Sequence, residues 1–304
     1  MEKSFSRPKQ FGEILDHVFQ LIKNNFGKLF LLVLAFYSPI ILLQAFIQIS
    51  SGQGLIRDLS PGDNFFEQIF NTIADFSEVA TPVELSGNFL IGLLNLLIYP
   101  LAFASVFLVI KQIKNRKSPD VKQATKEAFS RFWPLLGSYV LFSILIVFIT
   151  AIPITIVIAT AFTSFAADNL VLGILSILMI FPIILGIVLL VTRWIFFIPI
   201  TIEDSAPGIG ASFRLTKGRT WMTFFIFLTL MLVNGTIATA FEFFVLFLGY
   251  SVLYVLIINL VSVFTSVIFF VGFSVVYFDL QVRQSGSDLK QMIDEYQPST
   301  EVQS

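Results

Sequence analysis

The sequence predicts an all-α integral membrane protein with six transmembrane helices and additional amphipathic helices at the membrane surface. Two observations predict this fold class. Of the 304 residues, 56% are hydrophobic and only 13% are charged, whereas a soluble domain carries roughly 25% charged residues. The mean hydropathy is +0.86, and the apolar residues gather in runs long enough to cross a bilayer. Apolar surface in this amount needs lipid as a second solvent.

Six apolar runs have the length of a membrane span. A span needs about 20 apolar residues to cross about 30 Å of hydrocarbon, and each run consists mainly of Leu, Ile, Val, Phe and Ala with hardly a charge. The runs do not alternate with a period of two residues, which argues against a β-barrel. We expect helical spans at 29–49, 88–110, 135–163, 170–200, 222–248 and 251–278.

The distribution of basic residues indicates the orientation of the spans. Of the 19 Lys and Arg residues, all except Arg57 and Arg193 lie in the N-terminal segment, in the connections after the second and fourth spans, or in the tail. The connection 50–87 is instead rich in Asp and Glu. Because cytoplasmic connections are enriched in Lys and Arg, we expect a multi-pass protein of the cell membrane with both termini in the cytoplasm. This orientation requires an even number of spans.

We expect residues 1–304 to form a single polytopic membrane domain. Segment 1–28 is a cytoplasmic amphipathic segment, and 279–304 is a cytoplasmic polar tail. On the outer side, Asp63 could cap a short amphipathic helix that bears several Phe and Ile residues. We expect that helix to rest on the outer leaflet or to cap the bundle.

Three segments on the basic side have the spacing of amphipathic helices. In 9–27, apolar residues recur at helical intervals, and we expect this helix to lie along the inner leaflet. A second helix is predicted to start at Ser118-Pro-Asp, and a third covers Ile209 to Trp221. Each leads into a span. The chain therefore reads as three units of one interfacial helix and a two-span hairpin, beginning near 9, 118 and 205.

The sequence offers little for catalysis or for metal binding. Cysteine is absent, which excludes disulfides and thiolate chemistry. His17 is the only histidine, and we place it on the polar face of the first amphipathic helix. The sequence contains none of the glycine-rich phosphate loops or nucleophile turns that mark common enzymes. We therefore expect no catalytic residue, no metal site and no cofactor.

Charged residues in or near membrane spans are the first candidates for a functional site. Arg193 lies near the cytoplasmic end of the fourth span, where its side chain can reach the headgroups. We expect Arg193 to pair with Glu203 or with Asp279, which would join the fourth span to the end of the sixth. Arg193 and Glu203 are accordingly candidates for ligand binding.

Glu242 is the third ligand-binding candidate. It follows Trp221 by a helical length of about 31 Å, which places it near the outer headgroups. There it is either an ordinary interfacial carboxylate or a protonatable, cation-coupling group with Asn234 and Asn259 as polar neighbours. We expect the polar residues within the spans to form hydrogen bonds between helices.

Three stretches of the sequence carry a family resemblance. They are Arg7 to Asp16 with Phe19 and Asn25-Phe26; Arg193-Trp194 with Pro199, Glu203 and Ala211 to Trp221; and Tyr277 to Arg283 with Gly286, Asp288 and Leu289. Together they resemble the glycerophosphoryl diester phosphodiesterase membrane domain family and related bacterial polytopic proteins, over essentially the whole chain. In some members the membrane domain is joined to a soluble phosphodiesterase barrel, which holds the catalytic groups. Nothing in this sequence matches that barrel, so the resemblance implies a membrane module without the hydrolase.

These observations favour a non-enzymatic membrane module that supports or anchors a partner or organises the lipid around it. Membrane lipids, with anionic lipid at the cytoplasmic face, are the expected partners, together with a protein whose identity the sequence does not give. We expect no nucleic-acid partner. The alternative is a transporter or channel for a small or lipidic solute, which six spans and helix-interrupting prolines permit.

Overall fold

The computed structural model describes residues 5, 7–56, 82–204, 208–245, 248 and 251–296, and within these ranges the regular structure is helical, without strands. Six helical segments of this part of the chain are long and apolar enough to cross a membrane, as predicted. The helices are α1 (Phe11–Ser50), α3 (Pro82–Lys114), α4 (Val121–Ser130), α5 (Phe132–Ala166), α6 (Leu170–Leu178), α7 (Ile180–Trp194), α8 (Phe197–Asp204), α9 (Ile209–Leu215), α10 (Thr220–Val245) and α11 (Val252–Tyr296). The protein is therefore a multi-pass, all-α membrane protein.

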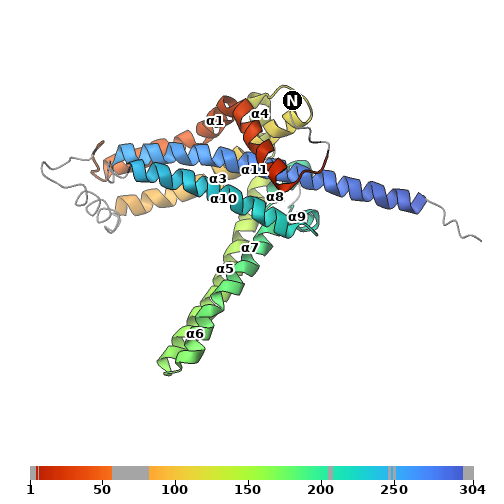
Figure 1. Cartoon of the computed structure of the whole chain (residues 1–304). Helices are drawn as coiled ribbons and strands as arrows, with labels where there is room; N and C mark the ends of the chain where they lie inside the picture. Colours follow the sequence, from red (N-terminus) through yellow and green to blue (C-terminus); the bar gives the residue numbers. More distant parts are fainter. Residues whose placement is uncertain are drawn as a thin grey trace, which may run out of the picture.

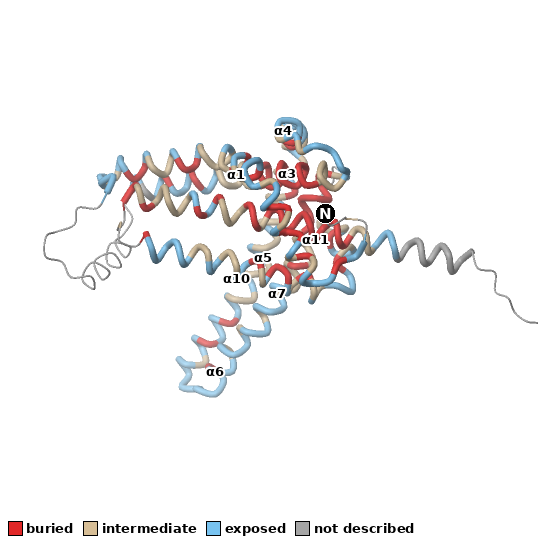
Figure 2. Tube along the Cα trace, turned by 45° about the horizontal axis from the view of Figure 1, so that its top comes forward, coloured by how far each residue is buried: buried red, intermediate tan, exposed pale blue. Residues whose placement is uncertain are grey.

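Four long helices form a bundle, and one hairpin leaves it. Helices α1, α3, α10 and α11 run side by side, and α11 is in contact with each of the other three. The hairpin of α5 with α6 and α7 departs from this group at a steep angle (Figure 1). Most of its apolar residues are exposed on the chain itself, and the tube of Figure 2 is pale blue over much of the hairpin. In a membrane, lipid covers such surface.

The most deeply buried part of the bundle is formed by the C-terminal part of α3 and the middle of α11. Every residue of 100–110 in α3 and of 270–280 in α11 is buried. Both stretches are apolar nearly all round, which is the composition of a helix that neighbours enclose on every side. Phe107 stacks on Phe278 at a centroid distance of 5.1 Å, and Phe103 meets Phe273 edge-on at 5.2 Å. Aromatic contacts thus join the two central helices.

Helix α1 combines the predicted amphipathic helix and the first span. The two parts meet at Asn25, whose φ of −128° and ψ of 17° are not helical. The apolar face of the first part packs into the protein, with Ile14, Val18 and Leu21 buried. His17 is also buried, against the ring of Phe5 at a centroid distance of 4.5 Å, so its predicted place on a polar face is wrong. The reason is that its helix packs on α11.

The two other predicted amphipathic helices are present. Asp120 begins α4, because its carboxylate accepts a hydrogen bond from the backbone N–H of Gln123 at 3.0 Å. Helix α9 is shorter than predicted, since it ends at Leu215 and is followed by a turn through Gly218, which has a φ of +78°. In the described residues, the order of short helix and two spans recurs three times. That these are copies of one unit stays a prediction.

The predicted span at 170–200 is not one continuous helix. It is interrupted at Met179, between α6 and α7, because Pro182 has no N–H and its ring would clash with the carbonyl group four residues earlier. It is interrupted again at Ile195 and Phe196, after which α8 turns into the protein core. Phe142 of α5 stacks on Phe197 at 4.4 Å, so aromatic packing draws α8 inward.

At the opposite end of the bundle, polar groups connect α1 and α11. Asn259 donates a hydrogen bond from Nδ2 to Oε1 of Gln44 at 2.6 Å, as expected for polar residues within spans. The first backbone N–H groups of α11 are used as well, since Val252 donates to the carbonyl oxygen of Gly54 at 3.2 Å. The amphipathic helix predicted after Asp63 falls in 57–81, outside the described residues.

The absence of cysteine makes the topology directly testable. Lys117 precedes α4 and Asp168 lies at the tip of the hairpin, so single Lys117→Cys and Asp168→Cys variants should be labelled from opposite sides of the membrane. Labelling by an impermeant maleimide, applied to sealed and then to opened vesicles, measures this. Labelling of both residues from one side would refute the arrangement of α5.

Candidate functional site

The short helices and most basic residues gather at one end of the bundle, here called the basic end: the N-terminal half of α1, the C-terminal end of α3, and helices α4, α8 and α9 (Figure 1). Three groups of polar contacts and two hollows occur there.

Arg193 joins the end of α7 to α9. Its guanidinium carbon lies 3.3 Å from the centroid of the Phe213 ring, and its Nη2 donates to the Phe213 carbonyl oxygen at 3.2 Å. The Ser212 hydroxyl donates to the Arg193 carbonyl oxygen at 2.7 Å and accepts from the N–H of Phe196 at 3.1 Å. One hydroxyl thus satisfies two backbone groups at the break before α8.

The predicted pairing of Arg193 with Glu203 or Asp279 is wrong. Glu203 lies at the end of α8, and its Oε1 forms an ion pair with Nζ of Lys111 in α3 at 3.0 Å. Its other oxygen accepts hydrogen bonds from the Tyr277 hydroxyl at 2.7 Å and from Nε2 of Gln281 at 2.8 Å. Because α8 turns inward after the break, Glu203 points towards α3 and α11, whereas Arg193 stays on the side of α9.

The Glu203 contacts connect three helices that are distant in sequence. Tyr277 and Gln281 are four residues apart and therefore lie on one face of α11. They belong to a stretch that carried the family resemblance, yet the sequence assigned them no role. Lys114, one turn after the ion-paired lysine of α3, donates to Gln281 at 3.3 Å and lies 4.1 Å from the Phe278 ring centroid. The arrangement satisfies its own charges and is a structural junction.

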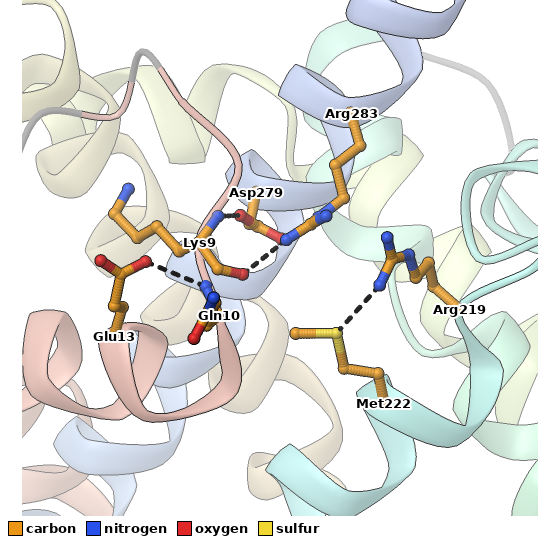
Figure 3. Close-up of polar contacts among 7 residues, drawn as sticks. All are labelled: Lys9, Gln10, Glu13, Arg219, Met222, Asp279 and Arg283. Carbon is orange, nitrogen blue, oxygen red and sulfur yellow. Dashed lines mark hydrogen bonds and ion pairs between the residues drawn. The ribbon is translucent and has the colours of Figure 1, made fainter.

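Asp279 holds the N-terminal segment against α11 (Figure 3). Its Oδ1 accepts from the backbone N–H of Lys9 at 2.7 Å, and its Oδ2 pairs with Nε of Arg283 at 2.6 Å. Arg283 also donates to the Lys9 carbonyl oxygen. Glu13 then closes the first turn of α1, since its carboxylate accepts from the N–H of Gln10 at 3.0 Å. The Glu13 side chain thus fixes where α1 begins.

Glu242 lies apart from these groups. It is exposed near the C-terminal end of α10 and makes no ion pair or hydrogen bond with another described residue. Asn259, one of its expected polar neighbours, is bound instead to Gln44. The three candidates Arg193, Glu203 and Glu242 therefore do not form a common site. Whether Glu242 has a role in coupling stays a prediction.

Two hollows flank α4 on opposite sides. A polar hollow of about 460 Å³ lies between α4 and the end of α3, lined by lysine, amide and carboxylate side chains that include Lys117 and Glu127. An apolar groove of about 730 Å³ lies between α4, α1 and α3, with Lys28 at its margin. A smaller aromatic cavity of about 200 Å³ lies where the hairpin meets the bundle, lined in part by Tyr99, Tyr139 and Phe197.

The basic end offers exposed Lys and Arg side chains that can bind anionic groups, and an apolar groove that can bind hydrocarbon. Among the described residues, no three or more His, Asp or Glu side chains cluster so that they could hold a metal ion. The groove was not foreseen from the sequence. The one sequence feature related to the groove is the amphipathic pattern of the segment after Ser118, and that pattern does not reveal which span the helix covers.

Comparison of the chain with protein-family models, with curated proteins and with solved structures finds no match. The resemblance to the phosphodiesterase membrane domain therefore stays a prediction.

The Glu203 junction predicts a clear order of stabilities. Glu203→Leu should lower the free energy of unfolding by about 1–3 kcal/mol, because it leaves Lys111, Tyr277 and Gln281 without their shared acceptor. Glu203→Gln should cost less, since its amide oxygen can still accept from Tyr277. Thermal unfolding in detergent measures both, with Asp204→Asn at the exposed neighbouring position as the control. Equal effects of Glu203→Leu and Asp204→Asn would show that the junction contributes nothing.

Proposed function

We propose that the protein is a non-enzymatic membrane module that binds anionic lipid at its basic end and organises the lipid there, in support of a partner. The observation that carries this proposal is a set of exposed cations at the basic end that form no ion pair with another described residue. They are Lys23, Lys28, Arg116, Lys117, Lys122, Lys126, Arg214, Lys217 and Arg219.

The contrast with the charges that the protein itself pairs supports this assignment. Glu203 and Asp279 are each engaged by a basic side chain of the protein, Lys111 and Arg283 respectively. The exposed cations therefore need counterions from outside the described chain. Anionic headgroups attract a juxtamembrane Lys or Arg with about 1 kcal/mol per residue. Anionic headgroups at this end of the spans can supply that charge.

The side of the membrane is part of the same proposal. Cytoplasmic leaflets carry the anionic lipids, and cytoplasmic connections carry the Lys and Arg residues. We therefore place the basic end and both termini in the cytoplasm, with the protein in the cell membrane. The resemblance to a membrane domain that occurs with and without a hydrolase agrees with a supporting, non-catalytic role.

Transport of a small or lipidic solute is the alternative proposal. Within the described residues, the buried half of the bundle near the basic end is apolar and aromatic, and Gln44 with Asn259 forms a single interhelical pair rather than a row. No observation here favours transport over lipid binding. Flux of phosphodiesters or small ions into vesicles that contain the protein would decide for this alternative.

The lipid preference can be measured with spin-labelled lipids in reconstituted vesicles. The anionic label should associate more strongly than the zwitterionic label, and the difference should shrink in high salt because exposed charges are screened. Replacing Lys122 and Lys126 with Gln should reduce the preference by at most about five-fold per lysine. The Lys122→Arg, Lys126→Arg variant keeps the charge and should retain the preference. An unmodified protein that shows no preference for the anionic label would refute the proposal.

A further inference from the structure

We propose that the apolar groove between α1, α3 and α4 binds one acyl chain of an anionic phospholipid, with the lipid phosphate at Lys28. This inference rests on the proposed function and names a discrete site for it. The lipid belongs to the leaflet at the basic end.

The lining of the groove suits a hydrocarbon chain. The volume is about 730 Å³, and apart from Lys28 and Thr125 the lining side chains are apolar. Leu32 of α1 and Leu101 of α3 are buried and form its floor. Phe129 of α4 forms part of one wall, where its ring stacks on Phe36 at a centroid distance of 5.9 Å. Both aromatic rings offer flat apolar surface to a chain that lies along them.

The length of the groove matches one leaflet. Along α1 it extends from Lys28 to Pro39, which corresponds to about 16 Å at about 1.5 Å per residue. The hydrocarbon core is about 30 Å thick, so each leaflet contributes about half of that depth. Ile98 and Leu101 line the same stretch from α3. A groove that starts at a charged residue and ends one leaflet deeper has the dimensions of an acyl chain beneath its headgroup.

Lys28 supplies the positive charge at the mouth. Its side chain is exposed, and Nζ lies 3.5 Å from the carbonyl oxygen of Pro119 in the connection before α4. It forms no ion pair with another described residue. A carbonyl oxygen at this distance orients the ammonium group without neutralising it. A lipid phosphate at the end of the groove can therefore bind to Lys28 through a charge-assisted hydrogen bond.

The orientation of α4 adds further positive charge to the same margin. Val121 and Thr125 line the groove, and each is followed directly by an exposed lysine, Lys122 and Lys126. Successive helical residues are about 100° apart, so the two lysines lie between the face that lines the groove and the face that lines the polar hollow. The carboxylates are placed elsewhere. Asp120 caps the helix, and Glu127 lines the polar hollow on the far side.

The experiment is native mass spectrometry of the protein released from nanodiscs of phosphatidylglycerol and phosphatidylcholine. The unmodified protein should retain one phosphatidylglycerol molecule. Lys28→Gln should lower the retention of this lipid relative to phosphatidylcholine by about five-fold, the loss of one lysine contact. Lys23→Gln is the matched comparison, because Lys23 is an exposed lysine of the same helix that does not line the groove. It can contribute to the general preference for anionic lipid, but it should lower retention of the single lipid less than Lys28→Gln does.

A second pair of variants tests the acyl chain. Ala35→Trp fills the groove from α1, and Thr125→Trp fills it from α4, so both should abolish retention of the single lipid. Leu42→Trp, at an exposed position of α1 outside the groove, should not. Because the two Trp substitutions lie in different helices, a folding defect in one variant would not explain loss of the lipid in both. Thermal unfolding of each variant shows whether it is folded. Inorganic phosphate and glycerol phosphate, which have no acyl chain, should not displace the lipid.

The outcomes separate the groove from the general lipid preference. If Lys28→Gln and Lys23→Gln lower the retention of phosphatidylglycerol equally, and Ala35→Trp and Thr125→Trp still retain it, the groove is not the site, although the proposed function stands. If the unmodified protein retains both lipids equally, the proposed function and the groove both fail. Displacement of the lipid by glycerol phosphate would show that the headgroup alone is recognised, which would overturn the acyl-chain assignment.

Discussion

The hydrocarbon of a bilayer offers no hydrogen-bond partner, so every backbone N–H and C=O group at that depth must be paired within the protein. Long helices meet this requirement along most of this chain. Where a helix breaks, another group must replace the lost partner. The break before α8 is the clearest case, because the Ser212 hydroxyl binds both the carbonyl oxygen of Arg193 and the N–H of Phe196. The same break allows α8 to enter the core and to bring Glu203 to Lys111.

The two ends of the bundle differ because they use polar residues differently. At the basic end, ion pairs and hydrogen bonds connect the N-terminal segment, α3, α8 and α11 through Asp279 and Glu203. At the opposite end, a single amide pair between Gln44 and Asn259 connects α1 to α11. The aromatic contacts between α3 and α11 are also concentrated near the basic end. This end is therefore the most densely connected part of the described bundle, and it can hold α4 in a constant position over the spans.

These contacts at the basic end keep the helices around the groove in fixed positions, which a lipid site requires. Helix α4 packs through Ala124 and Ala128, both buried, and small side chains allow it to approach the underlying helices closely. The groove lies beside it, lined by the stacked rings of Phe129 and Phe36 and by residues of α3. Its apolar lining and its single terminal lysine have the same polarity as a phospholipid, with charge at the membrane surface and hydrocarbon below.

The sequence by itself determined the helical class, the six spans, the short helices and the end at which the charges gather. These are local properties, since an apolar run, a helical period or an Asp at a helix start can be recognised without knowledge of its neighbours. The sequence also singled out Arg193 and Glu203, but it predicted their partners wrongly, and a ligand-binding role for them stays a prediction. Only the tertiary structure decided that His17 is buried, that the fourth span breaks before α8, and that α4 forms a groove with α1 and α3. Those features depend on which helices lie side by side, and many apolar sequences of similar composition satisfy the bilayer equally well.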